Sequence, residues 1–219
     1  MDDLQKRKLF NNKEVLARAE KDFCQLEEHQ LEIHKRALLD GRLHQQISSM
    51  EGRCLELLLK AHRPKKTLEI GSYLGMSASW ILRALNPGAQ LFCLERNAEY
   101  LSQAKEILLP VAEQKTIDLK FFEVEALEFL QQDLKDEFFD AIFVDANKTQ
   151  YPQYLEWSIA HLNTGALLLV DDLFLVEAEH LGEKQKKALR QSWQLLLSHP
   201  EVDANILPTG HGLAMALKK

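Results

Sequence analysis

The chain contains few cysteines: Cys24, Cys54 and Cys93 are the only three among 219 residues. Their number is odd, they lie far apart, and no two have CxxC spacing. The sequence therefore indicates neither a disulfide framework nor a cysteine-ligated zinc site. We expect all three to be buried thiols of a protein in a reducing compartment.

Positive charge is also scarce, with 27 Lys and Arg against 33 Asp and Glu and a formal net charge of −6. Binding to a nucleic-acid backbone requires an excess of clustered basic residues. The composition therefore argues against a nucleic-acid partner and favours chemistry on a small molecule.

Long apolar segments are absent as well. No run of about 18 apolar residues occurs, and the start "MDDLQKRKLF" lacks the apolar core of a signal peptide. We expect a cytoplasmic protein without a membrane partner. The content of 46% hydrophobic and 27% charged residues is that of a globular protein. The length suits one domain over residues 1–219, with residues 1–44 as an N-terminal helical extension.

Proline and glycine are missing between residues 3 and 39, a segment rich in Glu, Lys, Leu and Ala. This composition predicts helix, with a break near "FNN". An apolar stripe is formed by Leu16, Phe23, Leu26, Gln30, Ile33 and Ala37. The stripe favours packing on the domain or on a second subunit; a substrate lid is the alternative.

From residue 47 onward, helical and strand patterns alternate. After a helix over 47–64, strands are predicted at 66–71, 90–95, 118–125, 139–145 and 165–172, with helices at 77–86, 97–114, 126–134 and 151–162. Such alternation indicates an α/β fold with a doubly wound, mostly parallel sheet. A helix over 183–200 and two strands flanking "TGHG" close the chain. These two strands are expected to form an antiparallel pair.

A glycine turn follows the first strand in "LEIGSYLGMS", residues 68–77. Glycines at such a strand-to-helix turn let the backbone approach a ligand. Glu95 ends the next strand, where a carboxylate can accept both hydroxyls of a ribose. The spacing of Gly71 and Gly75 is not the GxGxxG of a dinucleotide site, which weighs against a nicotinamide oxidoreductase. The alternative is an ordinary glycine turn beside a surface glutamate.

Two apolar strands end on carboxylates: Asp145 follows one, and Asp171 with Asp172 ends the other. Ligands bind beyond the carboxyl ends of parallel strands, so three acids can converge there. Their mutual repulsion of roughly 1–4 kcal/mol per pair at about 4 Å would be relieved by a hard cation such as Mg²⁺. The spacing alone leaves an alternative open. Asp145 would then only cap the following segment, while Asp171 and Asp172 face solvent in a loop. Lys148 would likewise be an ordinary surface charge.

Together, residues 69–77, Glu95, "FDAIFVDANKTQY", "GALLLVDD" and "LPTGHGLAMALK" resemble the cation-dependent O-methyltransferases, the family of catechol and caffeoyl-CoA O-methyltransferases. The resemblance runs from about residue 45 to 219 and implies a methyltransferase domain. It implies methyl transfer from S-adenosylmethionine to one hydroxyl of a small aromatic diol, assisted by Mg²⁺ or a similar ion such as Mn²⁺ or Ca²⁺. It also implies a homodimer to which the N-terminal helical segment contributes.

Carried over by position, the resemblance implies that Asp145, Asp171 and Asp172 hold the metal and that Lys148 deprotonates the attacking hydroxyl. Asp172 stands where the family usually has asparagine. The cofactor-binding positions that it implies are Ile47, Glu69, Gly71, Ser72, Tyr73, Ser77, Glu95, Ala126, Asp145 and Asn147.

The chain departs from the family pattern at three further places. Gln45 replaces a methionine, Val124 replaces a glycine before the adenine-contacting residue, and "LFLV" replaces a segment with tryptophan and asparagine. The last segment helps to enclose substrate, so the natural acceptor stays open. A non-catalytic scaffold is a rival hypothesis, against which the retained Lys148 and the three acids weigh.

Overall fold

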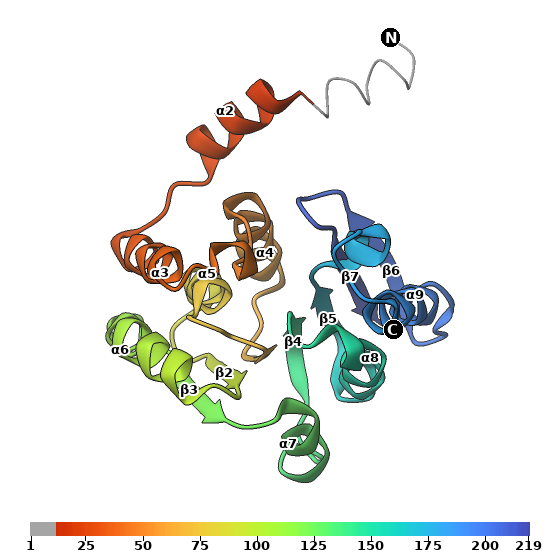
Figure 1. Cartoon of the computed structure of the whole chain (residues 1–219). Helices are drawn as coiled ribbons and strands as arrows, with labels where there is room; N and C mark the ends of the chain where they lie inside the picture. The colour runs from red at the N-terminus through yellow and green to blue at the C-terminus, as the bar shows by residue number, and fades with distance from the viewer. Residues whose placement is uncertain (1–11) are drawn as a thin grey trace.

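The computed structural model describes residues 12–219, so the expected helix over residues 3–11 lies outside the described residues. Within this range seven strands form one sheet in the order β3-β2-β1-β4-β5-β7-β6 (Figure 1). The strands are β1 (Lys66–Ile70), β2 (Gln90–Glu95), β3 (Asp118–Glu123), β4 (Phe139–Val144), β5 (Leu162–Val170), β6 (Val202–Leu207) and β7 (Leu213–Lys218).

The first five strands are parallel, and β7 pairs antiparallel with both β5 and β6. The doubly wound sheet and its antiparallel C-terminal pair are thus confirmed. Strand order reverses between β1 and β4, because the chain builds outward from β1 on one side and from β4 on the other. Open α/β sheets bind ligands at such a reversal.

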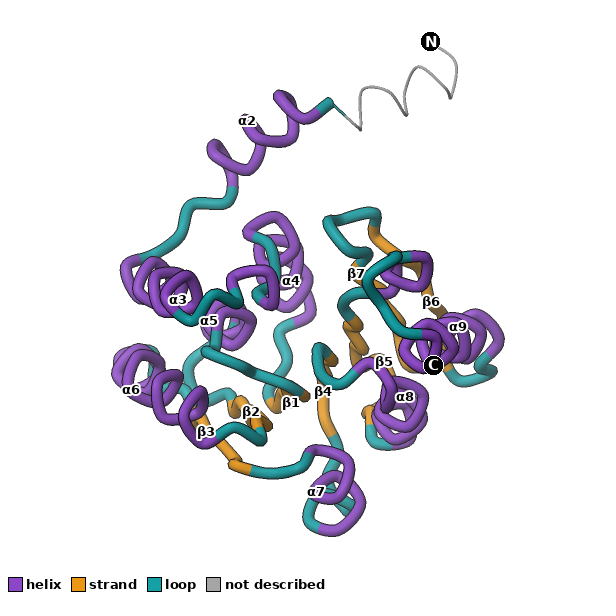
Figure 2. Tube along the Cα trace, in the orientation of Figure 1, coloured by secondary structure: helices purple, strands orange, loops and turns teal. Residues whose placement is uncertain are grey.

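Helices cover both faces of the sheet, as Figure 2 shows. The two hydrophobic clusters lie on opposite sides of the strands, one under α3 to α6 and the other under α7 to α9. The first group is α3 (Glu28–Leu39), α4 (Ser49–His62), α5 (Met76–Ala84) and α6 (Ala98–Gln114), and the second is α7 (Ala126–Gln132), α8 (Tyr151–Ala160) and α9 (Glu183–Ser198). Short 3₁₀ turns are η1 (Leu43–Gln45), η2 (Lys148–Gln150) and η3 (Leu173–Glu177).

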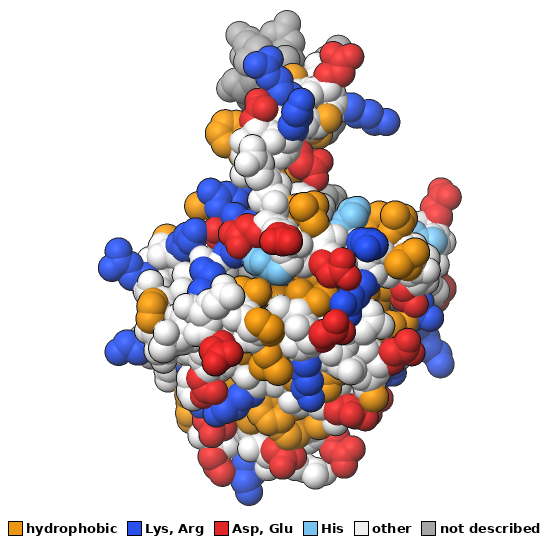
Figure 3. Space-filling view, turned by 90° about the vertical axis from the view of Figure 1, so that its left-hand side faces the viewer, with side chains coloured by type: hydrophobic (Ala, Val, Ile, Leu, Met, Phe, Trp, Pro, Cys, Tyr) orange, Lys and Arg blue, Asp and Glu red, His pale blue; other side chains and the backbone are white. Residues whose placement is uncertain are grey.

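The N-terminal helices differ from expectation. Asn12, the last residue of "FNN", caps the start of the helix α2 (Lys13–Phe23), and a further, unexpected break lies at residues 24–27. The expected single stripe is wrong for α2, where Leu16 and Phe23 are 39% and 73% exposed and no residue is buried. It holds for α3, whose buried residues are Gln30, Ile33 and Ala37. In Figure 3, α2 stands clear of the body, whose visible face mixes acidic and basic side chains.

The three cysteines are unpaired in the described part of the chain; Cys24 and Cys93 are buried and Cys54 is half-buried. Burial raises the pKa of the Cys93 thiol well above its ordinary value, so this side chain serves as a packing group. Among residues 12–219, no helix combines the length and the apolar character that crossing a membrane requires.

Candidate active site

Three neighbouring parallel strands end at the same level of the sheet. Ile70 of β1 lies opposite Val144 of β4, which in turn lies opposite Val170 of β5. The ladder continues for one residue beyond the strands: the N–H of Asp145 donates to the carbonyl of Ile70 at 3.0 Å. The N–H of Asp171 donates to the carbonyl of Val144 at the same distance, 3.0 Å. Backbone pairing therefore brings Asp145 and Asp171 side by side.

Asp145, Asp171 and Asp172 form one carboxylate cluster, with an oxygen of each within 4.8 Å of the others. The three acids thus converge as expected from the sequence, while their role as metal ligands stays a prediction. Burial raises the pKa of Asp145, and the charge of Asp172 adds to it. Burial and the two neighbouring acids raise the pKa of Asp171, which is 3% exposed, well above its usual range.

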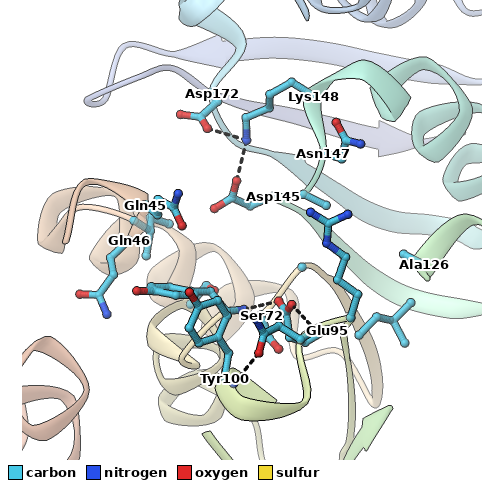
Figure 4. A pocket seen from close by; sticks show the side chains of 18 of the residues that line it. Gln45, Gln46, Ser72, Glu95, Tyr100, Ala126, Asp145, Asn147, Lys148 and Asp172 are labelled. Carbon is cyan, nitrogen blue, oxygen red and sulfur yellow. Dashed lines mark hydrogen bonds and ion pairs between the residues drawn. The ribbon is translucent and has the colours of Figure 1, made fainter. Parts of the chain in front are cut away.

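The ammonium group of Lys148 lies between Asp145 and Asp172 of this cluster (Figure 4). It donates to Oδ1 of Asp145 at 2.7 Å and lies 2.6 Å from Oδ2 of Asp172. It also donates to the hydroxyl of the buried Tyr151 at 2.7 Å. Burial lowers the pKa of Lys148, but the surrounding carboxylates raise it by more, so the net shift is well above the ordinary value. The lysine is therefore a charged partner of the acids.

Asn147 fixes the point at which Lys148 enters the cluster. Its side-chain carbonyl accepts the N–H of Thr149 at 3.1 Å and the hydroxyl of Thr149 at 3.0 Å. This cap begins the 3₁₀ turn η2 with Lys148 as its first residue. Asn147 also lines the cavity described below, as its predicted cofactor role requires.

Asp172 turns the chain away from β5 with a φ of 67°, in the left-handed region. Its N–H donates to Oδ1 of Asp171 at 2.8 Å, and its own Oδ1 lies 2.9 Å from Nδ1 of His211. Burial raises the pKa of Asp172, but the bond with His211 and the charge of Lys148 lower it by more. The bond with Asp172 in turn raises the pKa of His211. Asp172 is therefore a charged acid between the Lys148 ammonium group and the imidazole of His211.

The glycine turn is tied to the acidic cluster. Gly71 has a φ of 94°, and a Cβ placed on it would overlap the backbone carbonyl of Asp145. Only glycine both adopts this positive φ without strain and leaves the space beside the carbonyl free. Gly75 has a φ of 89° and caps the N-terminus of α5, where a Cβ would overlap Leu108. The turn between β1 and α5 therefore depends on both glycines.

Glu95 supports the same turn from β2. Its Oε2 accepts the N–H of Tyr73 at 2.9 Å, and its Oε1 accepts the N–H of Asn97 at 2.9 Å. Tyr73 has a φ of 48°, a conformation that costs a non-glycine residue about 1–3 kcal/mol. Each Glu95 oxygen retains a second lone-pair direction, so the carboxylate can still accept ligand hydroxyls.

A cavity of about 900 Å³ lies between the glycine turn and the acidic cluster. This volume falls in the range of small-molecule sites. Neither α2 nor α3 contributes a residue to its lining, so these two helices do not form the lid considered as an alternative. The predicted site residues that line it are Ile47, Gly71, Ser72, Tyr73, Ser77, Glu95, Ala126, Asp145, Asn147, Lys148 and Asp172.

Glu69 and Asp171 are the two predicted site residues that do not line the cavity. Glu69 is the penultimate residue of β1 with 0% exposure, and neither of its oxygens makes a hydrogen bond of regular geometry in the described chain. Burial raises the pKa of Glu69 to about 7; the nearby Ser77 hydroxyl and Cys93 thiol oppose this rise, and the charges of Asp145 and Glu95 add to it. A role of Glu69 toward the cofactor must therefore act through the turn above it.

Several site residues escaped the sequence analysis. His211 lies in "TGHG", a stretch that the sequence indicates only as a turn between strands, and its backbone N–H donates to Oε1 of Glu51 at 2.9 Å. Glu51 is recognisable in the sequence only as part of a capping box with Ser48. Tyr100, on α6, also lines the cavity. No local signal marks these residues, because their contacts join segments far apart in the chain.

Comparison with known proteins agrees with this geometry. A sequence model of the O-methyltransferase family matches residues 20–219. Caffeoyl-CoA O-methyltransferase 2 of Eucalyptus globulus is 31% identical over 77% of this chain and 72% of its own. Catechol O-methyltransferase of Mycobacterium tuberculosis is 28% identical over 78% of this chain and 80% of its own.

The fold has close counterparts among solved structures. The O-methyltransferase from Bacillus cereus in complex with SAH superposes with a TM-score of 0.82 at 24% identity, covering 94% of this chain and 97% of that one. The family expected from the sequence is confirmed by the sequence match, and the fold by the superposition. The chain belongs to the O-methyltransferase family.

Proposed function

We propose that the protein transfers the methyl group of S-adenosylmethionine to one hydroxyl of a small catechol-like aromatic, with a divalent cation assisting. One observation carries the proposal: a single cavity has the Gly71 turn with Glu95 at one end and Lys148 with its carboxylates at the other. The first end suits a nucleoside cofactor, and the second suits activation of a hydroxyl. Relatives named for catechol and caffeoyl-CoA support this acceptor class.

The cofactor is proposed to lie along the glycine turn. Because Gly71 has no side chain, the cofactor's methionine portion can approach the backbone of the turn. Glu95 is proposed to accept the ribose hydroxyls with its remaining lone pairs. Ala126, which starts α7, lines the cavity on the side proposed for the adenine. In this orientation the sulfonium methyl group would face the end of the cavity that Lys148 lines.

The donor set of the acidic cluster fits a hard divalent cation. All three candidate ligands are carboxylates, and Asp171 is nearly fully buried. Mg²⁺ prefers oxygen ligands, as Mn²⁺ and Ca²⁺ do. A divalent ion held by Asp145, Asp171 and Asp172 would supply charge that lowers the pKa of a substrate hydroxyl.

Lys148 is proposed to accept the proton of the attacking hydroxyl. A phenolic hydroxyl has a pKa of about 10, so proton transfer to a base is needed near neutral pH. Nζ of Lys148 faces the cavity, but its contacts with two carboxylates keep it protonated. The lysine can act as a base only when those contacts weaken and its pKa falls. Holding the oxygen in line with the methyl group would supply much of the remaining rate.

The acceptor ring is proposed to lie beyond the carboxylates, against the segment that departs from the family pattern. Leu175 of this segment and Leu181, which follows it before α9, line the cavity and offer apolar contacts to a ring. His180 and Gln185 lie beside them and can hydrogen-bond to polar substituents. This mixture suits a small substituted aromatic.

A homodimer stays a prediction, in which α2 is proposed to meet a second copy of the chain. Its apolar side chains Val15 and Phe23 are 54% and 73% exposed. Light scattering of the full chain and of a chain lacking residues 1–23 tests this: the full chain should have twice the expected mass and the shortened chain should not. A monomeric full chain would refute the prediction.

Calorimetry followed by an activity assay tests the proposed function. S-adenosylmethionine should bind and NAD should not. Methyl transfer to 3,4-dihydroxy aromatics should require Mg²⁺ and stop with EDTA, while monohydroxy analogues should react poorly. Activity that survives chelation would refute the role of the metal. Absence of binding of S-adenosylmethionine would refute the proposed methyl-transfer activity. Independently of activity, Mg²⁺ should raise the melting temperature of the wild type more than that of Asp171→Asn.

A further inference from the structure

The connection between α3 and α4 forms one wall of the cavity. We call residues 40–47 the wall segment, and five of its residues line the cavity: Arg42, His44, Gln45, Gln46 and Ile47. Figure 4 shows Gln45 and Gln46 on the side of the cavity opposite Ala126. A cofactor on the glycine turn would therefore lie between the wall segment and α7.

Asp40 begins the wall segment and binds two tyrosines from other elements. Its Oδ2 accepts the hydroxyl of Tyr73 at 2.9 Å and the hydroxyl of Tyr100 at 3.2 Å. Tyr73 belongs to the glycine turn and Tyr100 to α6, and both line the cavity. Burial and the bond to Asp40 raise the pKa of both hydroxyls, so they remain donors in the physiological range. One carboxylate thus ties the wall segment to two other sides of the site.

Tyr73 is held at both of its ends. Its N–H donates to Glu95, and its hydroxyl donates to Asp40. Its ring packs edge-to-face on that of Tyr100, with centroids 4.7 Å apart. The left-handed backbone of Tyr73 therefore persists because two carboxylates and an aromatic neighbour define its position.

Arg42 offers Asp40 a competing partner, but with weaker geometry. Its Nε lies 3.7 Å from Oδ2 of Asp40, and its side chain is 50% exposed. Its guanidinium lies 5.7 Å from the centre of the Tyr100 ring. An ion pair this long and this exposed contributes little, so the hydroxyl contacts at 2.9 and 3.2 Å define the carboxylate's position.

We propose that Asp40 is a positioning residue for the methyl donor, which it serves by holding Tyr73 and the wall segment in the cofactor-binding arrangement. This inference rests on the proposed function, because it assumes that S-adenosylmethionine occupies the turn. Asp40 acts on binding through Tyr73 and lies away from Lys148. Its loss should therefore weaken the cofactor complex and leave the transfer step unchanged once the cofactor is bound.

Four variants separate this role from a merely structural one. Asp40→Ala removes both acceptor contacts, Asp40→Asn retains a carbonyl oxygen, and Tyr100→Phe removes one contact without altering the turn. Asp136→Ala, at an exposed aspartate between α7 and β4, is the matched control. The measurements are the dissociation constant of S-adenosylmethionine by calorimetry, kcat and KM for the cofactor, and the melting temperature without ligand.

The expected result is an increase of about tenfold in the dissociation constant and KM for Asp40→Ala, with kcat within about twofold. Asp40→Asn should recover most of the affinity, and Asp136→Ala should match the wild type. Tyr100→Phe should weaken binding about threefold, and should add little to Asp40→Ala because the two share one contact.

Unchanged cofactor affinity in a folded Asp40→Ala protein would overturn the inference, even if its melting temperature fell. If that variant does not fold, Tyr100→Phe decides: weaker binding supports the inference and unchanged binding overturns it. A wild type that fails to bind S-adenosylmethionine overturns the proposed function and this inference together. If the wild type and Asp40→Ala bind S-adenosylmethionine equally well, only the inference about Asp40 is overturned and the proposed function stands.

Discussion

The ammonium group of Lys148 lies 2.6 Å from the carboxylate oxygen Oδ2 of Asp172. Lys148 follows β4 and Asp172 follows β5, so this ion pair joins the ends of two neighbouring strands. The pair is largely buried, and its charges are therefore poorly screened by solvent. It provides positive charge among three converging acids, and it also keeps the proposed base protonated. The same contact thus stabilises the site and opposes its proposed chemistry.

Replacing Lys148 by methionine tests its role as the base. Methionine fills similar space without a proton-accepting nitrogen, so kcat should fall by roughly 10²-fold or more. The dissociation constant of S-adenosylmethionine, measured by calorimetry, should change little because the lysine is proposed to face the acceptor.

The exposed Lys135 provides the control for this substitution, and Lys135→Met should retain full activity. Loss of cofactor binding in Lys148→Met with kcat preserved at saturation would contradict the assignment. It would place the lysine on the cofactor side of the cavity.

Asp172→Asn should change the pH dependence of the reaction. Asparagine tolerates the left-handed backbone found at this position, so the turn should survive. Losing this carboxylate removes one cause of the raised pKa of Lys148, so that pKa should fall. A base works when deprotonated, and the rising limb of kcat against pH should therefore move to lower pH.

Asp203→Asn supplies the matched control, because Asp203 on β6 is 75% exposed, pairs with Lys219 and does not line the cavity. Its pH profile should coincide with that of the wild type. A rising limb that moves to higher pH in Asp172→Asn would exclude Lys148 as the group that titrates.

Local sequence patterns were sufficient to predict the strand ends of the site. Apolar strands that alternate with helices predict a parallel sheet, and the residues after β4 and β5 then share one edge. Asp145 and Asp171 could be placed together on this basis, because hydrogen bonding between strands fixes their level. The glycine spacing likewise indicated a tight turn at Gly71, where the backbone has a positive φ and leaves no room for a Cβ.

The break at residues 24–27 and the contacts of Asp40 could not be predicted from the sequence, because tertiary contacts determine them. The break before α3 contains neither proline nor glycine. It is fixed where the N–H of Glu27 donates to the side chain of Gln30, which in turn donates to Ser79 at 3.0 Å. Asp40 meets tyrosines 33 and 60 residues further along the chain. No periodicity within one segment reports contacts at such separations.

Gly71→Ala should be costly for two separable reasons. The positive φ alone should cost about 1–2 kcal/mol of unfolding free energy. Overlap of the new Cβ with the carbonyl of Asp145 should add about 1–3 kcal/mol and displace the turn. Affinity for S-adenosylmethionine should fall at least tenfold, as measured by calorimetry beside urea unfolding.

Gly88→Ala isolates the backbone contribution. Gly88 has a φ of 83°, and a Cβ on it would meet nothing within 4 Å. The Gly88→Ala variant should lose only the roughly 1–2 kcal/mol of unfolding free energy that the positive φ costs, and it should bind the cofactor normally. Equal destabilisation by the two substitutions would show that the turn accommodates the methyl group and that contact with Asp145 is not limiting.

Glu69→Gln should alter how stability depends on pH. The pKa of Glu69 is raised to about 7 in the folded protein, from an ordinary value of 4.5. Between these values the folded state retains a proton that the unfolded state has released, so the wild type loses stability as pH rises through this window. The loss at this site should reach about 3 kcal/mol above pH 7. Glutamine carries no charge at any pH and escapes it. Urea unfolding at pH 4.5, 6 and 8 should therefore show that the free energy of unfolding of Glu69→Gln rises relative to that of the wild type at each step. A difference that stays constant with pH would mean that the buried carboxylate finds a compensating partner.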